Sequence, residues 1–222
     1  MPNSEDWLQD PLMRIDRVSY KYHRLKSPAD KQDELWQIFH FSTRLKLDGV
    51  AHFYRQVVGA ASMPDDVGLP LLAYSQLKWY LDAFFFELTS AYETLLQELN
   101  IIYAYDLELE PKQVRWDTIK DKLPRELFTY MEQEWEKDWF YEVRSHRNLA
   151  THHYVVPLAS SKVGFGEEPL DYDEHTVSIF CIDKTGNIKS KYIRVCVEYL
   201  KDMVRYISSV WEKMAQEFQR EQ

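Results

Sequence analysis

Apolar residues recur at intervals of three and four along most of the chain, which is the spacing of one buried face of an α-helix. The longest such pattern runs through residues 71–103 without an internal proline or glycine. Its stripe holds Leu77, Leu81, Phe84, Phe85, Leu88, Tyr92, Leu95, Leu96 and Leu99. Similar patterns cover residues 28–60 and 194–219. We therefore expect three long helices over these ranges.

The helix expected over residues 28–60 has the start and the stripe of an amphipathic helix. Ser27 is the candidate N-cap, Pro28 fits the first turn, and Asp30 and Asp33 suit the positive end of the helix dipole. The apolar stripe contains Leu35, Ile38, Phe39, Leu45, Val50, Phe53, Tyr54 and Val57. The spacing predicts a buried face, and the helix could bend at Gly49.

A fourth helical segment lies between Pro124 and Pro157. Its stripe contains Phe128, Met131, Trp135, Trp139, Val143, His146, Ala150 and His153. We expect one helix here, or two helices joined by a kink near residue 138. A short helix over 117–123, with Asp117 as its N-cap, is expected before it. The aromatic residues of these stripes are expected to form the core: Trp79, Phe84, Phe85, Phe86, Trp135 and Trp139.

The segment before the last helix has a different pattern. Residues 158–174 contain two glycines and one proline, which predict a loop. Residues 175–195 contain a β-branched run, a Lys-Thr-Gly-Asn turn and a second short run, which predict a β-hairpin. The sequence therefore predicts an all-α fold: an up-and-down bundle of about four long helices, with a short helix and a small peripheral β-hairpin. We expect a single domain over 1–222, in which 157–193 is a loop plus hairpin inserted before the last helix.

Composition narrows the class of protein. With 222 residues and 45% hydrophobic content, the chain can bury a substantial single core. It has only six glycines and contains neither G-x-G-x-x-G nor G-x-x-x-x-G-K-[ST], so dinucleotide-binding and P-loop sites are not expected. Cys181 and Cys196 have no metal-ligand spacing, and we expect them to be buried and inert in a reducing, cytoplasmic setting. No segment resembles a signal peptide or is apolar enough to span a membrane.

The formal net charge is −9. Such a protein repels a polyanion at long range, so any contact with nucleic acid has to be local and focused. Against this background, the stretch YEVRSHRNLATHHY at residues 141–154 is unusual, because it gathers two arginines, an asparagine and three histidines.

On a helix at about 100° per residue, six of these side chains share a polar arc opposite the apolar stripe. They are Tyr141, Arg144, Arg147, Asn148, Thr151 and His152. His146 and His153 fall on the stripe instead, and we expect both to be packed histidines. Arginine binds a phosphodiester bidentately without losing its charge, and histidine can move a proton near neutral pH. RNA supplies its own 2′-hydroxyl nucleophile, so this arc predicts an RNA-cutting site that needs no metal or other cofactor.

The hexapeptide RNLATH, Arg147 to His152, resembles the R-N-x-x-x-H motif of the HEPN superfamily, as does the expected helical bundle with the motif on a late helix. Many members of that superfamily are metal-independent ribonucleases of toxin–antitoxin, abortive-infection or RNA-processing systems, and they typically form dimers in which two motifs face one another. By this resemblance, Arg147 holds the scissile phosphate, Asn148 orients the site and His152 is the acid or base. The candidate substrate contacts are Tyr141, Arg144 and Thr151.

The resemblance implies an endoribonuclease acting on single-stranded RNA as a homodimer. The acidic surface suggests restricted substrate entry, or restraint by a basic, inhibitory protein partner. Arg144 could instead pair with a carboxylate such as Glu142. An acidic residue of the neighbouring helix, Glu87 or Glu93, could support Arg147 or His152.

Two other functions remain open. The polar arc could bind a nucleotide or a protein without chemistry, or could be an ordinary solvated helix face. A weaker alternative is a metal-dependent nucleotide pyrophosphohydrolase that uses carboxylates of the segment MEQEWEKD: Glu132, Glu134, Glu136 and Asp138. That family carries an E-x-x-E pattern, which this sequence lacks. A solvated acidic face is the better interpretation of these carboxylates.

Overall fold

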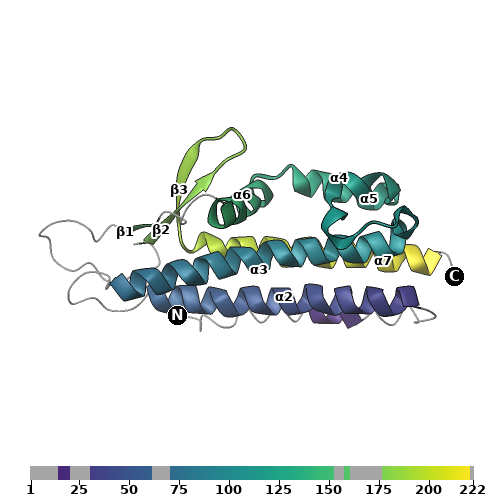
Figure 1. Ribbon diagram of the computed structural model, residues 1–222, viewed down its shortest axis with the longest axis horizontal. Coiled ribbons are helices and arrows are strands. Elements are labelled where there is room, and N and C mark those ends of the chain that lie inside the picture. Colours follow the sequence, from purple (N-terminus) through teal and green to yellow (C-terminus); the bar gives the residue numbers. More distant parts are fainter. Residues whose placement is uncertain (1–14, 21–30, 62–70, 153–157, 161–176, 221–222) are drawn as a thin grey trace, which may run out of the picture. The chain divides into compact units, whose positions relative to one another are not determined.

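The computed structural model describes residues 15–20, 31–61, 71–152, 158–160 and 177–220 (Figure 1). Five helices of at least eleven residues dominate these ranges: α2 (Lys31–Ala61), α3 (Leu71–Tyr103), α5 (Arg125–Trp135), α6 (Asp138–His152) and α7 (Val195–Arg220). The all-α prediction is confirmed, and α3 has the predicted bounds. The predicted N-terminal signals Ser27, Pro28 and Asp30 lie outside the described residues, as does the side chain of Asp33.

The segment expected as one or two helices forms two, because the chain turns at residues 136–137. Before them, the short helix α4 (Trp116–Ile119) is followed by a 3-10 turn at Lys120–Lys122. The prediction that Asp117 is the N-cap is wrong, because Asp117 lies inside the first turn. The N-cap is Arg115, two residues earlier, and the hydroxyl of Thr118 accepts a hydrogen bond of 2.9 Å from its N–H.

Three antiparallel strands form the sheet, in the order β1 (Leu158–Ser160), β2 (Val177–Ile182) and β3 (Ile188–Tyr192). The predicted hairpin is β2–β3, whereas β1 lies in the segment expected to be a loop. A strand of three residues is too short to show alternation, so only its pairing with β2 reveals it. In the hairpin turn, Asp183 Oδ1 accepts hydrogen bonds from the Thr185 and Asn187 N–H groups at 2.9 and 3.0 Å. Gly186 adopts a φ of 84°, a conformation that is unfavourable for residues with a Cβ atom.

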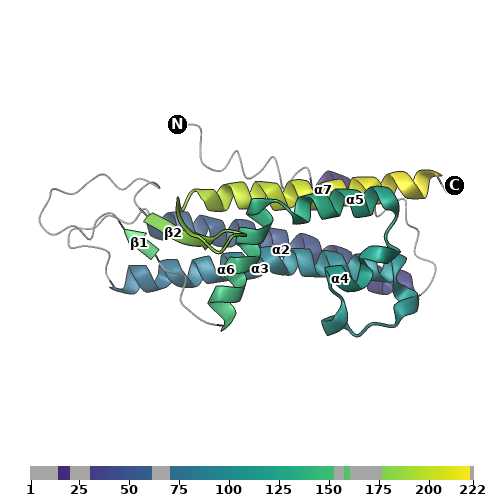
Figure 2. The same ribbon diagram turned by 90° about the horizontal axis from the view of Figure 1, so that it is seen from above.

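The chain divides into two compact units. The first contains Met1–Asp48, Ser90–Lys137 and Lys201–Gln222, and the second contains Gly49–Thr89 and Asp138–Leu200. Helices α2, α3 and α7 contribute residues to both units. The second unit holds α6 and the sheet, and α6 packs against β2 (Figures 1 and 2).

A fully buried carboxylate organises the first unit. Glu98 accepts hydrogen bonds from the indole N–H groups of Trp36 at 2.9 Å and Trp211 at 3.0 Å. The Nδ1 of His40 lies 3.1 Å from the same carboxylate, and its Nε2 lies 2.6 Å from the Ser19 hydroxyl. Donation from Nδ1 to the carboxylate leaves Nε2 free to accept from Ser19, so every polar group of the network has a partner. This network links residues 15–20, α2, α3 and α7.

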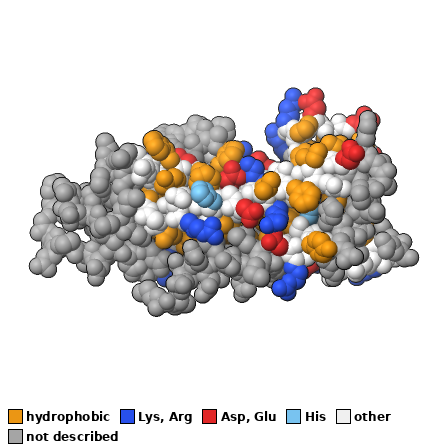
Figure 3. All heavy atoms as spheres, turned by 90° about the horizontal axis from the view of Figure 1, so that it is seen from below, with side chains coloured by type: hydrophobic (Ala, Val, Ile, Leu, Met, Phe, Trp, Pro, Cys, Tyr) orange, Lys and Arg blue, Asp and Glu red, His pale blue; other side chains and the backbone are white. Residues whose placement is uncertain are grey.

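Because of this network, the buried face of α2 differs from the face that the sequence predicted. Trp36, His40 and Thr43 occupy the core, while three members of the predicted stripe are exposed by 41–68%: Leu35, Ile38 and Leu45. The predicted buried face is therefore wrong in this part of α2, because polar residues with partners displaced apolar ones. Figure 3 shows hydrophobic side chains lying among charged side chains on one face of the molecule.

Two further predictions about the core need correction. On α5 the buried residues are Leu127, Met131 and Glu134, whereas Phe128 and Trp135 are only partly buried and stack on Trp116. On α3, the neighbouring rings Phe84 and Phe85 are fully buried as expected. However, Trp79 and Phe86 are exposed by 62% and 50%, since they lie on the opposite face of the helix.

Candidate functional site

Helix α6 carries the arginine and histidine cluster. It continues without a break from Asp138 to His152, so Arg147 and His152 lie on one helix, separated by a rise of roughly 7.5 Å. Tyr141, Arg144 and Arg147 are partly exposed. The side chains of three other candidates fall outside the described part of the structure: Asn148, Thr151 and His152. His153 lies outside the described residues.

The inner face of α6 is held by a buried carboxylate. Glu142 is 2% exposed and accepts a hydrogen bond of 2.8 Å from the Tyr199 hydroxyl on α7. The Nζ of Lys191 on β3 lies 2.6 Å from the same oxygen. The hypothesis that Arg144 pairs with Glu142 is therefore wrong, because Glu142 turns inward to partners from two other elements. Burial is the main cause that raises the pKa of Tyr199 far above its usual value, so the phenol remains a donor.

His146 lies one helical turn after Glu142 and is 1% exposed, as predicted for a packed histidine. Its ring stacks on Phe85 of α3, with ring centroids 4.1 Å apart and an interplanar angle of 15°. Its Nε2 lies 3.1 Å from Sγ of Cys181 on β2. Burial, aided by the charge of Lys191, lowers the pKa of His146 to about 4. The imidazole is therefore neutral at physiological pH.

The contact between His146 and Cys181 is not a reactive pair. Both cysteines are buried, as predicted, and burial is the main cause that raises the pKa of each thiol. A nucleophilic cysteine needs a thiolate beside a charged imidazole, whereas this site holds a thiol beside a neutral one. Within the described residues, Nδ1 of His146 has no hydrogen-bond partner. The residue therefore acts in packing α6 against α3 and β2.

The buried residues Glu142 and His146 determine which face of α6 points into the protein. Glu142 and His146 are four residues apart and share one face, which is turned toward α3, β2, β3 and α7. Arg147 follows His146 and points about 100° away from it around the helix axis, and Arg144 points further away. The arrangement leaves Arg144 and Arg147 partly exposed on a helix whose opposite face is buried.

The acidic residues that the sequence offered as metal ligands or as partners of Arg147 and His152 do not form one cluster. Glu134 is buried and pairs with Lys137, and Asp138 lies 3.2 Å from Lys184. Glu87 lies against Gly49 of α2, while Glu93 is an exposed residue of the first unit. In the part of the chain that the structure describes, no three His, Cys, Asp or Glu side chains are grouped to hold a metal ion.

Sequence reasoning missed Glu142 as the carboxylate that positions α6. The available signal was its four-residue spacing from His146 on the same helix. Its partners Lys191 and Tyr199 follow it by 49 and 57 residues, so no local pattern could identify them.

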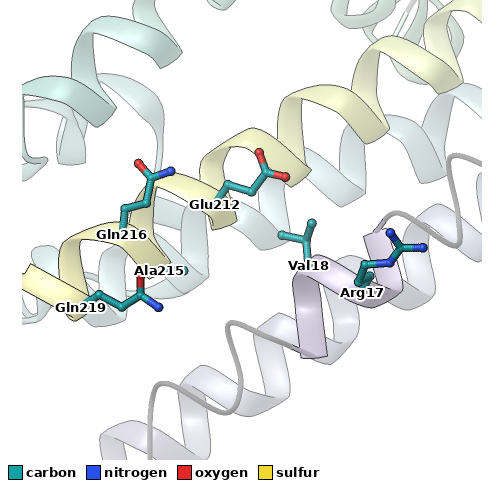
Figure 4. Close-up of a pocket in the computed structure, with 6 residues that line it drawn as sticks. All are labelled: Arg17, Val18, Glu212, Ala215, Gln216 and Gln219. Atoms are coloured by element: carbon teal, nitrogen blue, oxygen red, sulfur yellow. The ribbon is translucent and has the colours of Figure 1, made fainter.

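A pocket of about 290 Å³ lies in the first unit (Figure 4). Its walls come from residues 15–20 and from the last turns of α7, and contain Arg17, Val18, Glu212, Ala215, Gln216 and Gln219. Of the predicted site residues whose side chains the structure describes, none is among these lining residues.

Comparison with known proteins identifies the family. A family model described as HEPN_Cthe2314-like HEPN matches residues 32–215, a range that includes α6 and most of α2 and α7. Neither the curated proteins nor the solved structures contain a match. No helix among the described residues has the length and apolar character required to cross a membrane. Since the family model matches most of the chain, over a range that spans residues 147–152, the chain belongs to the HEPN_Cthe2314-like HEPN family.

Proposed function

We propose that this protein is a metal-independent endoribonuclease acting on single-stranded RNA, with Arg147, Asn148 and His152 as its reacting groups. The observation that carries the proposal is the position of the motif: it occupies the C-terminal part of α6, in a chain of the HEPN family. Glu142 and His146 hold the opposite face of that helix in the core. This burial supports the proposal, because a catalytic site needs an element whose orientation is fixed by its packing.

In the proposed reaction, the 2′-oxygen of the RNA attacks the adjacent phosphorus and the bond to the 5′-oxygen breaks. One proton leaves the 2′-hydroxyl and another is delivered to the 5′-oxygen, which gives a 2′,3′-cyclic phosphate and a 5′-hydroxyl. Arg147 binds the nonbridging oxygens, where negative charge grows in the transition state. His152 transfers one of the protons, and Asn148 orients the phosphate or the imidazole.

The proposed arc carries one imidazole, that of His152, because His146 is buried and neutral on the inner face. Two proton transfers are easier with a second histidine, so we propose that two copies pair their α6 helices and share the reaction. Tyr141, Arg144 and Thr151 would contact the RNA on either side of the cleaved bond. The net charge of −9 favours a short, locally bound strand and a basic inhibitory protein as a second partner.

The test uses labelled single-stranded RNA incubated with the protein in EDTA. We expect cleavage to products ending in a 2′,3′-cyclic phosphate, and no cleavage of a strand with a single 2′-deoxy substitution at the cut. His152→Ala should abolish cleavage, whereas His52→Ala should not, since His52 is an exposed histidine of α2 in the same unit.

Equal cleavage by wild type and His152→Ala would refute the proposed role of His152. Absence of cleavage by the wild type, together with thermal stabilisation by a nucleotide, would instead favour a non-catalytic binding module. Cleavage only after addition of magnesium or manganese would favour the metal-dependent alternative.

A further inference from the structure

Two aromatic rings of α3 lie outside the core of the second unit. Trp79 is 62% exposed and Phe86 is 50% exposed. They are seven residues apart, which places them on the same face of the helix with a separation of roughly 10.5 Å along its axis. Each exposed ring leaves apolar surface in water, and a ligand that covers it would recover the free energy of that exposure.

Phe86 directly follows a residue of the contact between α3 and α6, and Trp79 lies about two turns earlier on α3. Phe85, the residue before Phe86, stacks on His146, which directly precedes Arg147. Consecutive helical residues point about 100° apart. The aromatic face of α3 and the arginine-bearing face of α6 are therefore both adjacent to one buried contact, and all these residues belong to the second unit.

The size of the patch favours a small, flat ligand over a protein. Two aromatic side chains of roughly 150–250 Å² each, exposed by 62% and 50%, leave on the order of 200 Å² of apolar surface. A stable protein interface needs roughly 800 Å² per partner. The surroundings are also polar, since Lys78 and Asp82 lie beside the rings and form an ion pair of 4.0 Å.

We propose that Trp79 and Phe86 are a base-stacking platform for the single-stranded RNA that the α6 site binds. The proposal rests on the proposed function and adds to it the part of the protein that holds the bases. The Lys78–Asp82 pair makes this face neutral, whereas α6 supplies the positive charge through Arg144 and Arg147. Bases then stack on α3 while phosphates meet α6. The ring spacing of roughly 10 Å is about three times the 3.4 Å rise of stacked bases, so the two rings contact bases that are not neighbours.

Binding is measured with protein that carries His152→Ala, which keeps the RNA intact. The probes are a fluorescent single-stranded RNA and an abasic strand of the same length, at one salt concentration. We expect Trp79→Ala to raise the Kd for the RNA about tenfold and to leave the Kd for the abasic strand unchanged. Trp79→Phe should restore most of the affinity, and Phe86→Ala should behave like Trp79→Ala.

Ile188→Ala is the matched control, since Ile188 is a 71% exposed apolar residue of β3 in the same unit and should leave both Kd values unchanged. The proposal is overturned if Trp79→Ala binds RNA as tightly as its parent, or weakens both strands equally. A change of oligomeric state with unchanged RNA binding would assign the rings to a protein interface instead. Absence of cleavage by the wild type would count against the ribonuclease alone, because the base-dependent part of the affinity is measured without cleavage.

Discussion

The Nζ of Lys191 lies 2.6 Å from Oε2 of Glu142, and this ion pair joins β3 to α6. The Glu142 side chain is 3% exposed, and the Lys191 side chain is 32% exposed. A carboxylate in this position needs its partners, because an uncompensated buried charge is strongly destabilising.

We therefore expect Lys191→Met to lower the free energy of unfolding by about 1–3 kcal/mol, since Glu142 would lose its charged partner and keep the bond from Tyr199. Urea denaturation measures this change. Lys184→Met is the matched control, because the pair of Lys184 with Asp138 joins side chains that are 54% and 61% exposed and should contribute less than about 1 kcal/mol. Equal effects of the two substitutions would contradict the role given to Glu142.

The neutral imidazole of His146 predicts a dependence of stability on pH. Its pKa is lowered from 6.5 to about 4 in the folded protein, so the unfolded chain takes up this proton first as pH falls. Its contribution is therefore complete above pH 6.5 and is lost as pH falls toward 4, with a total of about 3 kcal/mol.

His146→Phe keeps a ring against Phe85 and removes the titrating group, so the slope of unfolding free energy against pH should become smaller between pH 4 and 6.5. The free energy is measured by urea denaturation across this range. A slope that does not change in His146→Phe would show that other groups cause the acid sensitivity.

The carboxylate of Glu98 accepts three ring N–H groups in a fully buried position. Glu98→Ala would leave the donors of Trp36, His40 and Trp211 without an acceptor, and we expect a loss of more than about 3 kcal/mol in the free energy of unfolding. Glu93→Ala, an exposed position on the same helix, should change it by less than about 0.5 kcal/mol. Thermal unfolding of the two variants provides the comparison, and a small effect of Glu98→Ala would contradict the network.

Two glycines should respond to alanine in opposite directions. Gly186 has a φ of 84° in the hairpin turn, so Gly186→Ala should destabilise the protein by about 1 kcal/mol. Gly59 lies in α2, and a Cβ atom built there meets nothing within 4 Å, so Gly59→Ala should stabilise by up to about 1 kcal/mol. Urea midpoints with an unchanged m-value would measure both changes, and shifts of the same sign would refute this account of the turn.

The sequence predicted the elements better than their faces. The range of α3 follows from its uninterrupted apolar spacing, and the hairpin follows from its Lys-Thr-Gly-Asn turn. On α2 the apolar spacing predicted the wrong buried face. His40 and Thr43 are buried, because they have partners on other elements, while Leu35 and Ile38 are exposed. Hydrophobicity alone assigns a polar residue to the surface, and only a partner elsewhere reverses that assignment.

By itself, the sequence determined that a late helix carries the RNLATH motif within a mostly helical HEPN chain. Helical periodicity is a local property, so a single segment encodes it. Only the tertiary structure decided that Glu142 is buried and that Trp79 is exposed. The reason is that the burial of a side chain depends on the groups around it, and Lys191 reaches Glu142 from 49 residues away. The residues next to Glu142 in the sequence do not predict such a contact.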